Sequence, residues 1–127
     1  MANFRTPMAR VRGLGSAKDG TEHFWRQRLT AIANVPLVLL MVGLVVALAG
    51  SSYTQVRFAL ANPVIAVLVA LAMISVLYHM RLGMQVIIED YVHDELAKII
   101  LIALNIFFSF IVGAATLLAL ISIVIGG

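Results

Sequence analysis

The chain has 127 residues, of which 62% are hydrophobic, and it contains no cysteine. A soluble domain of this size buries only about 65–70% of its unfolded surface and cannot hide so much apolar side chain, so the composition indicates an integral membrane protein. The lack of cysteine excludes disulfides, thiolate metal sites, cysteine nucleophiles and iron–sulfur ligation within this chain. The net charge of +3 does not predict binding to nucleic acid, because the basic residues gather at one end, where membrane proteins use them for orientation.

The sequence divides into a polar, basic arm over residues 1–27 and a transmembrane domain over residues 28–127. The first apolar run covers about 29–49. A run of about 20 apolar residues matches the thickness of a bilayer, so we expect a membrane-spanning helix that starts near Arg28. Pro36 lies inside this helix, and an interior proline predicts a bend.

Two more spans follow, over about 61–90 and 98–125. Six of the nine basic residues precede Thr30, whereas the polar link 50–62 carries only Arg57. Positively charged residues stay on the cytoplasmic side. We therefore predict an all-α, up-down-up protein with three transmembrane helices and a cytoplasmic N-terminus. The basic residues before Thr30 are Arg5, Arg10, Arg12, Lys18, Arg26 and Arg28.

The stretch 78–95 (YHMRLGMQVIIEDYVHDE) contains two of the chain's three histidines and four of its six acidic residues, so any cofactor site or reaction of this chain is expected here. His79 is expected about 13 Å along the helix axis from Ile88, within the membrane. An ionisable group at that depth faces the bundle interior or a cavity. Its imidazole could simply bond another helix, or it could ligate a metal or a haem iron. Gly83, one turn further on, leaves room for a flat ring and favours the haem interpretation.

Three further polar residues of this stretch are candidates for a functional role. Arg81 can extend its guanidinium to the interface, or pair with a cofactor carboxylate or an acid of a partner. Asp90 and Tyr91 stand at the predicted membrane boundary above His79. A phenol donates well to a carbonyl oxygen, and a neighbouring carboxylate can orient it or relay protons. This pair therefore suits a lipid-soluble carbonyl compound.

His79, Gly83, Asp90 and Tyr91 at this spacing resemble the small, hydrophobic membrane-anchor subunit of succinate dehydrogenase, respiratory complex II. The segment 22–32 (EHFWRQRLTAI) resembles the same family's lead into its first helix. The resemblance extends over nearly the whole chain, and it is strongest to alphaproteobacterial and mitochondrial-type members. It implies a subunit of succinate:ubiquinone oxidoreductase that holds no catalytic residue by itself and forms half of a heteromeric helix bundle.

The resemblance also implies roles for individual residues. His79 would be an axial ligand of haem b, and Gly83 would pack against the haem. Tyr91 would donate to a ubiquinone carbonyl with support from Asp90, and Arg28 would lie near the haem propionates and the quinone pocket. Arg81 receives no role from the family.

The implied partners are a second membrane-anchor subunit (the cytochrome b subunit), which supplies the other haem ligand, an iron–sulfur subunit and a flavoprotein subunit. The implied location is the bacterial inner membrane, or its matrix-side equivalent in a mitochondrion. Two other hypotheses remain open. In one, His79 and Arg81 line a path through a small transporter or channel subunit, and in the other the chain is a structural assembly subunit without a ligand.

Overall fold

The computed structural model describes residues 6–11 and 19–126. Within these ranges the regular elements are all helical, and α2, α4 and α5 are long and apolar enough to cross a membrane. These observations confirm the predicted all-α fold with three spans. Arg5, Arg12 and Lys18 of the predicted basic arm lie outside the described residues. The helices are α1 (Pro7–Val11), α2 (Asp19–Leu48), α3 (Tyr53–Ala61), α4 (Pro63–Tyr91) and α5 (Glu95–Ile125).

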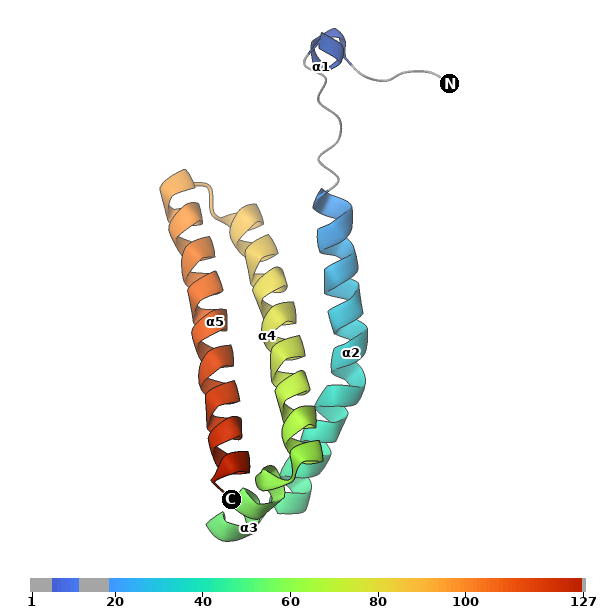
Figure 1. Ribbon diagram of the computed structural model, residues 1–127. Coiled ribbons are helices and arrows are strands. Elements are labelled where there is room, and N and C mark those ends of the chain that lie inside the picture. The colour runs from blue at the N-terminus through green and yellow to red at the C-terminus, as the bar shows by residue number, and fades with distance from the viewer. Residues whose placement is uncertain (1–5, 12–18, 127) are drawn as a thin grey trace.

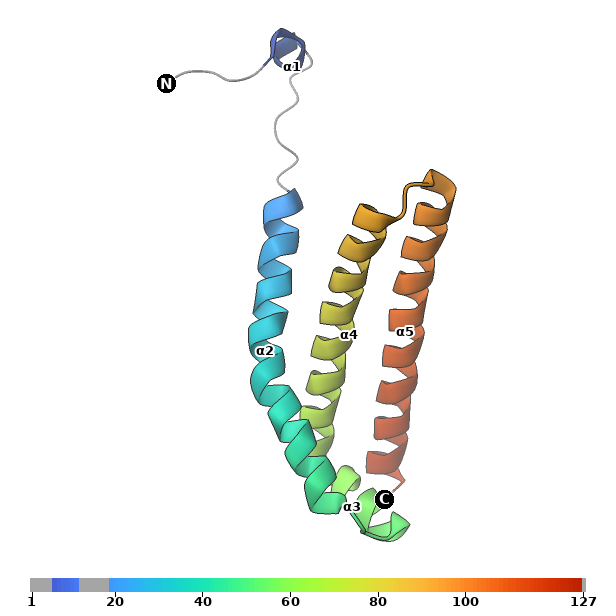
Figure 2. The same ribbon diagram turned by 180° about the vertical axis from the view of Figure 1, so that it is seen from behind.

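The three long helices run in alternating directions, and α4 lies between α2 and α5 (Figures 1 and 2). The start of α2 and the link between α4 and α5 share one end of the bundle, whereas α3 and the end of α5 share the other (Figure 1). The up-down-up arrangement is therefore as predicted. α2 is bent along its length (Figure 2), and Pro36 lies inside it, in agreement with the expected bend.

Most of the link predicted over 50–62 forms the short helix α3, and polar residues at its two ends cap it. The Ser52 side chain accepts from the backbone N–H of Gln55, whose own side chain accepts from the backbone N–H of Ser52. This reciprocal pair is a capping box, and it begins α3. Asn62 then ends α3 and begins α4, where its Oδ1 accepts from the N–H of Val64 at 2.9 Å.

Two helices extend further into polar sequence than the apolar runs predict. α2 begins at Asp19 rather than near Arg28, and Glu22 pairs with Arg26 one turn later. α5 begins at Glu95 rather than near residue 98, with Asp94 Oδ1 accepting from the N–H of Ala97 at 2.7 Å. α4 ends at Tyr91, one residue beyond the predicted span. Hydrophobicity marks the hydrocarbon region only, and side-chain pairs four residues apart support a helix beyond it.

Burial is concentrated in α4. Among the described residues the buried apolar side chains are Ala66, Val69, Ala72, Leu82, Ile88 and Leu120. All but Leu120 belong to α4, so this helix is the centre of the chain. Large apolar side chains are exposed along α2 and α5. Apolar faces of this extent mark contact with lipid or with other subunits.

Candidate functional site

A stripe of polar and small residues lies where α2 meets α4, and we call it the polar seam. Its α2 members have the spacing i, i+4, i+7, i+11, and its α4 members have the spacing i, i+4, i+8, so each set shares one helix face. The two sets meet at two contacts, between Thr30 and His79 and between Gln27 and Gly83. The members are His23, Gln27, Thr30 and Asn34 of α2, and Ser75, His79 and Gly83 of α4.

His79 is the central residue of the polar seam. Its Nδ1 lies 3.0 Å from the hydroxyl oxygen of Thr30, and the ring is partly buried. Among the described residues no hydrogen bond is recorded to its Nε2, and this atom is not among the fully buried polar atoms without a partner. One ring nitrogen thus contacts α2, and the other has no hydrogen-bond partner among the described residues.

Several buried polar atoms of the polar seam have no hydrogen-bond partner among the described residues. They are His23 Nε2, Gln27 Oε1, Asn34 Oδ1 and Ser75 Oγ. Unpaired polar groups away from water are costly. Four such atoms at the α2–α4 interface therefore distinguish this interface from the other contacts between helices. Our sequence reasoning did not identify this seam. The signal was present in the helical spacing of polar residues across two different spans.

Gly83 lies in the polar seam, where α2 approaches closely. A Cβ built at this position would lie 3.4 Å from Nε2 of Gln27. The neighbour of Gly83 within this chain is thus the end of a flexible side chain, which leaves room for a methyl group but crowds a larger residue. Packing of Gly83 against a haem stays a prediction.

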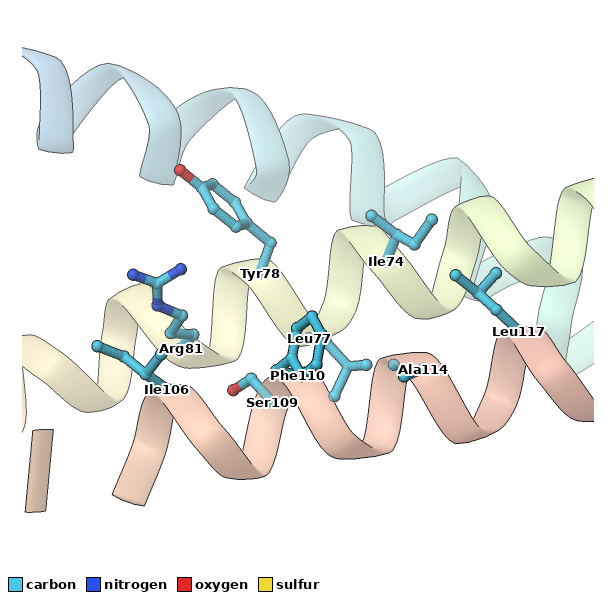
Figure 3. A pocket seen from close by; sticks show the side chains of 10 residues that line it. Ile74, Leu77, Tyr78, Arg81, Ile106, Ser109, Phe110, Ala114 and Leu117 are labelled. Atoms are coloured by element: carbon cyan, nitrogen blue, oxygen red, sulfur yellow. The ribbon is translucent and has the colours of Figure 1, made fainter. Parts of the chain in front are cut away.

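Arg81 lies away from His79, in a groove between α4 and α5 (Figure 3). The groove has a volume of about 360 Å³ and a mostly apolar lining, with Tyr78 and Ser109 as further polar members. Arg81 Nε has no partner among the described residues. Because His79 contacts α2 and Arg81 lies beside α5, the two side chains do not line one path. This arrangement disfavours the hypothesis of a transporter or channel.

Asp90 and Tyr91 end α4 on its exposed surface. Tyr91 is 77% exposed, and no hydrogen bond to its phenol is recorded among the described residues. Twelve residues of helix place Tyr91 about 18 Å from His79 along the axis. A phenol at this position can donate to a ligand or to another subunit.

Arg28 lies on the exposed surface of α2, outside the polar seam. Its guanidinium carbon stands 4.5 Å from the centroid of the Phe24 ring. Among the described residues no hydrogen bond or ring contact joins Arg28 to His79. The structure therefore does not bring Arg28, His79 and Tyr91 together within this chain. Their predicted roles would each need a ligand or another subunit to contact the chain.

Comparison with known proteins identifies the family of the chain. The family model for the succinate dehydrogenase/fumarate reductase transmembrane subunit matches residues 2–113. A succinate dehydrogenase hydrophobic membrane anchor subunit from Rickettsia bellii is 35% identical over 106 residues, which cover 83% of this chain and 85% of the relative.

Two other relatives are similar over much of their length. The corresponding subunit from Paracoccus denitrificans is 32% identical and covers 91% of this chain and 88% of its own length. A succinate dehydrogenase membrane anchor subunit from Reclinomonas americana is 32% identical over 68% of this chain and 75% of its own length. No solved structure matches. On the family match and these identities, the chain belongs to the family of succinate dehydrogenase/fumarate reductase transmembrane subunits.

Proposed function

We propose that this chain is the hydrophobic membrane-anchor subunit of a succinate:ubiquinone oxidoreductase, with His79 as one axial ligand of haem b. The observation that carries this proposal is an imidazole in the middle of a membrane-spanning helix, with Nδ1 in contact with Thr30 and no hydrogen bond recorded to Nε2 among the described residues. A polar ionisable group at this depth marks a functional site. The names of the relatives support the membrane-anchor role.

The residues present fit a haem. A neutral imidazole ligates iron through one ring nitrogen while the other bonds a neighbouring group, which is the state of His79. Haem b, when bound, supplies a one-electron carrier within the membrane. His79 holds the iron from this chain's side, and Arg28 offers a positive charge to a propionate. Gly83 has no side chain of its own one turn from His79, and the Gln27 side chain that lies beside it would have to move for a haem to pack there.

Ubiquinone is the proposed substrate at the end of α4. The exposed phenol of Tyr91 donates a hydrogen bond to a quinone carbonyl, which orients the ring and favours negative charge on that oxygen. Asp90 is adjacent and exposed, and its carboxylate can accept and release protons at the membrane boundary. Reduction of a quinone to a quinol takes up two electrons and two protons, and Asp90 would supply a route for those protons from the aqueous side.

The proposed partners cover the exposed faces of the chain. A second membrane anchor, the cytochrome b subunit, brings the other haem ligand to the iron held by Nε2 of His79 and completes the bundle. An iron–sulfur subunit docks beside Tyr91 on the cytoplasmic side and carries the flavoprotein subunit. The membrane is the bacterial inner membrane, or its mitochondrial equivalent. The exposed apolar side chains of α2 and α5 support burial against lipid and a partner.

The test uses the complete co-expressed complex and compares matched pairs of variants. His79→Ala should remove the b-type absorption of the dithionite-reduced complex, whereas His93→Ala, at a histidine in the link after α4, should leave it. A complex that keeps its b-type spectrum in His79→Ala would overturn the assignment of the ligand.

The quinone site is tested with a second pair. Tyr91→Phe should slow ubiquinone reduction by about 100-fold, at the lower end of the range for loss of one transition-state donor, while succinate oxidation by a soluble dye is unchanged. Tyr53→Phe is the control, because Tyr53 is also 77% exposed but lies in α3, at the other end of the bundle. Equal rates in the two variants would contradict the role of Tyr91.

A further inference from the structure

Building on the proposed haem ligation by His79, we propose that Thr30 is a positioning residue for that histidine. Its hydroxyl accepts a hydrogen bond from Nδ1–H and so selects the tautomer in which Nε2 carries the free lone pair. This role places a determinant of haem binding on α2, one helix away from the ligand itself.

The first step concerns the proton of the Thr30 hydroxyl. The Thr30 oxygen lies 2.8 Å from the carbonyl oxygen of Arg26 and 3.0 Å from that of Gln27. Carbonyl oxygens only accept, and a hydroxyl has one proton to donate. A threonine within a helix commonly donates this proton to a carbonyl three or four residues earlier. The Thr30 proton is therefore directed back along α2.

The second step concerns the histidine. With its proton directed along α2, the Thr30 oxygen offers lone pairs to the atom 3.0 Å away, which is Nδ1 of His79. In this arrangement Nδ1 is the donor. A neutral imidazole has only one N–H, so Nε2 has no proton and can bind a metal. The geometry of two adjacent helices thus prepares His79 as a ligand before any iron is present.

The consequence concerns the iron. Ligating histidines generally donate their second N–H to an acceptor, which fixes the ring and raises the basicity of the ligating nitrogen. A more basic imidazole stabilises the more highly charged ferric state. Thr30 should therefore tighten haem binding and lower the midpoint potential, relative to an imidazole without an acceptor at Nδ1.

The same chain offers a matched control. Thr116 is partly buried, and its hydroxyl donates to the carbonyl oxygen of Val112 at 2.8 Å. This bond is the same type that Thr30 makes within α2. No bond from Thr116 to another helix is recorded among the described residues. The contact across to His79 is thus what distinguishes Thr30.

The experiment compares Thr30→Val, Thr30→Ser and Thr116→Val in the complete complex. Valine keeps the shape of threonine but removes the acceptor, whereas serine keeps the hydroxyl. We expect Thr30→Val to weaken haem retention by about 10-fold or more, as for loss of other outer-shell partners. The midpoint potential of its remaining haem b should rise. Thr30→Ser and Thr116→Val should resemble the unmodified complex in both measurements.

Three outcomes would overturn the role of Thr30. These are an unchanged potential and haem content in Thr30→Val, equal effects in Thr30→Val and Thr116→Val, or a loss in Thr30→Ser as large as in Thr30→Val. If Thr30→Val does not assemble, Thr30→Cys serves instead, because sulfur is a weak acceptor. It should give a smaller rise in potential, and no rise would reject the proposal. His79→Ala separates the two proposals, because haem retained in that variant refutes the ligand assignment itself.

Discussion

The two interfaces of α4 differ in how their polar groups are satisfied. On the α5 side, Asn105 Nδ2 donates to the carbonyl oxygen of Arg81 at 2.9 Å, and the hydroxyl of Ser109 donates within its own helix at 2.8 Å. On the α2 side, Thr30 meets His79, but most of the neighbouring polar atoms have no partner among the described residues.

This difference indicates what each interface does. Helices in a membrane associate through packing, small residues and hydrogen bonds rather than through the hydrophobic effect. The α4–α5 interface meets these needs mainly within the chain, with Arg81 as its exception. The polar seam holds open donors and acceptors at a high cost, which is expected where a chain contributes to a shared site. We therefore assign the scaffold to the α5 side and the function to the α2 side.

The largest effect is expected from a bulky side chain in the polar seam. Gly83→Leu should push α2 away from α4, because even a Cβ at this position would already be 3.4 Å from Gln27 Nε2. Overpacking costs about 1–3 kcal/mol, and the displaced helix would also lose the contact between Thr30 and His79. Thermal unfolding and haem content of the solubilised complex provide the measurement.

Two other variants serve as controls for the size of the side chain and for its position. Gly83→Ala should have little effect, since a lone methyl group makes only an ordinary contact there. Gly43→Leu should also be tolerated within the chain, because nothing lies within 4 Å of a Cβ at that position. Haem content in Gly83→Leu equal to that in Gly83→Ala would show that the close approach of α2 is not needed.

A smaller effect is expected from the α4–α5 interface. Asn105→Leu removes the donor to the Arg81 carbonyl and puts an apolar side chain of similar size in its place. Hydrogen bonds between membrane helices contribute about 0.6 kcal/mol on average and about 1.7 kcal/mol at most. The unfolding midpoint should therefore fall modestly, with the haem spectrum unchanged. A changed haem spectrum would contradict the division between the two interfaces.

The smallest change in stability is expected when a buried polar atom without a hydrogen-bond partner is removed. Ser75→Ala removes a buried hydroxyl that is unpaired among the described residues, and removing such a group is close to neutral or stabilising. Ser109→Ala is the matched control, because it removes a hydroxyl that donates to the Asn105 carbonyl. Thermal unfolding of both variants is the measurement. A larger loss in Ser75→Ala than in Ser109→Ala would mean that Ser75 has a partner in the assembled complex.

The candidate site was predictable from sequence only in part. His79 stood out because an ionisable residue interrupts an apolar run, and Tyr91 and Asp90 stood out because they follow its end. Thr30 gave no such signal, since a single threonine in a membrane span is ordinary. Its importance depends on which face of α2 meets α4, and helical periodicity within one span does not determine its neighbour.

The sequence by itself determined the number of spans, their alternating directions and the depth of His79, because hydrocarbon thickness and helical rise leave few alternatives. Only the tertiary structure decided that Arg81 lines a groove between α4 and α5, that Gln27 occupies the space beside Gly83 and that Thr30 contacts Nδ1 of His79. The physical reason is that hydrophobicity measures transfer from water to lipid, which is nearly the same for every rotation of a helix about its axis. The rotation that brings particular atoms together is selected by packing and hydrogen bonds between helices.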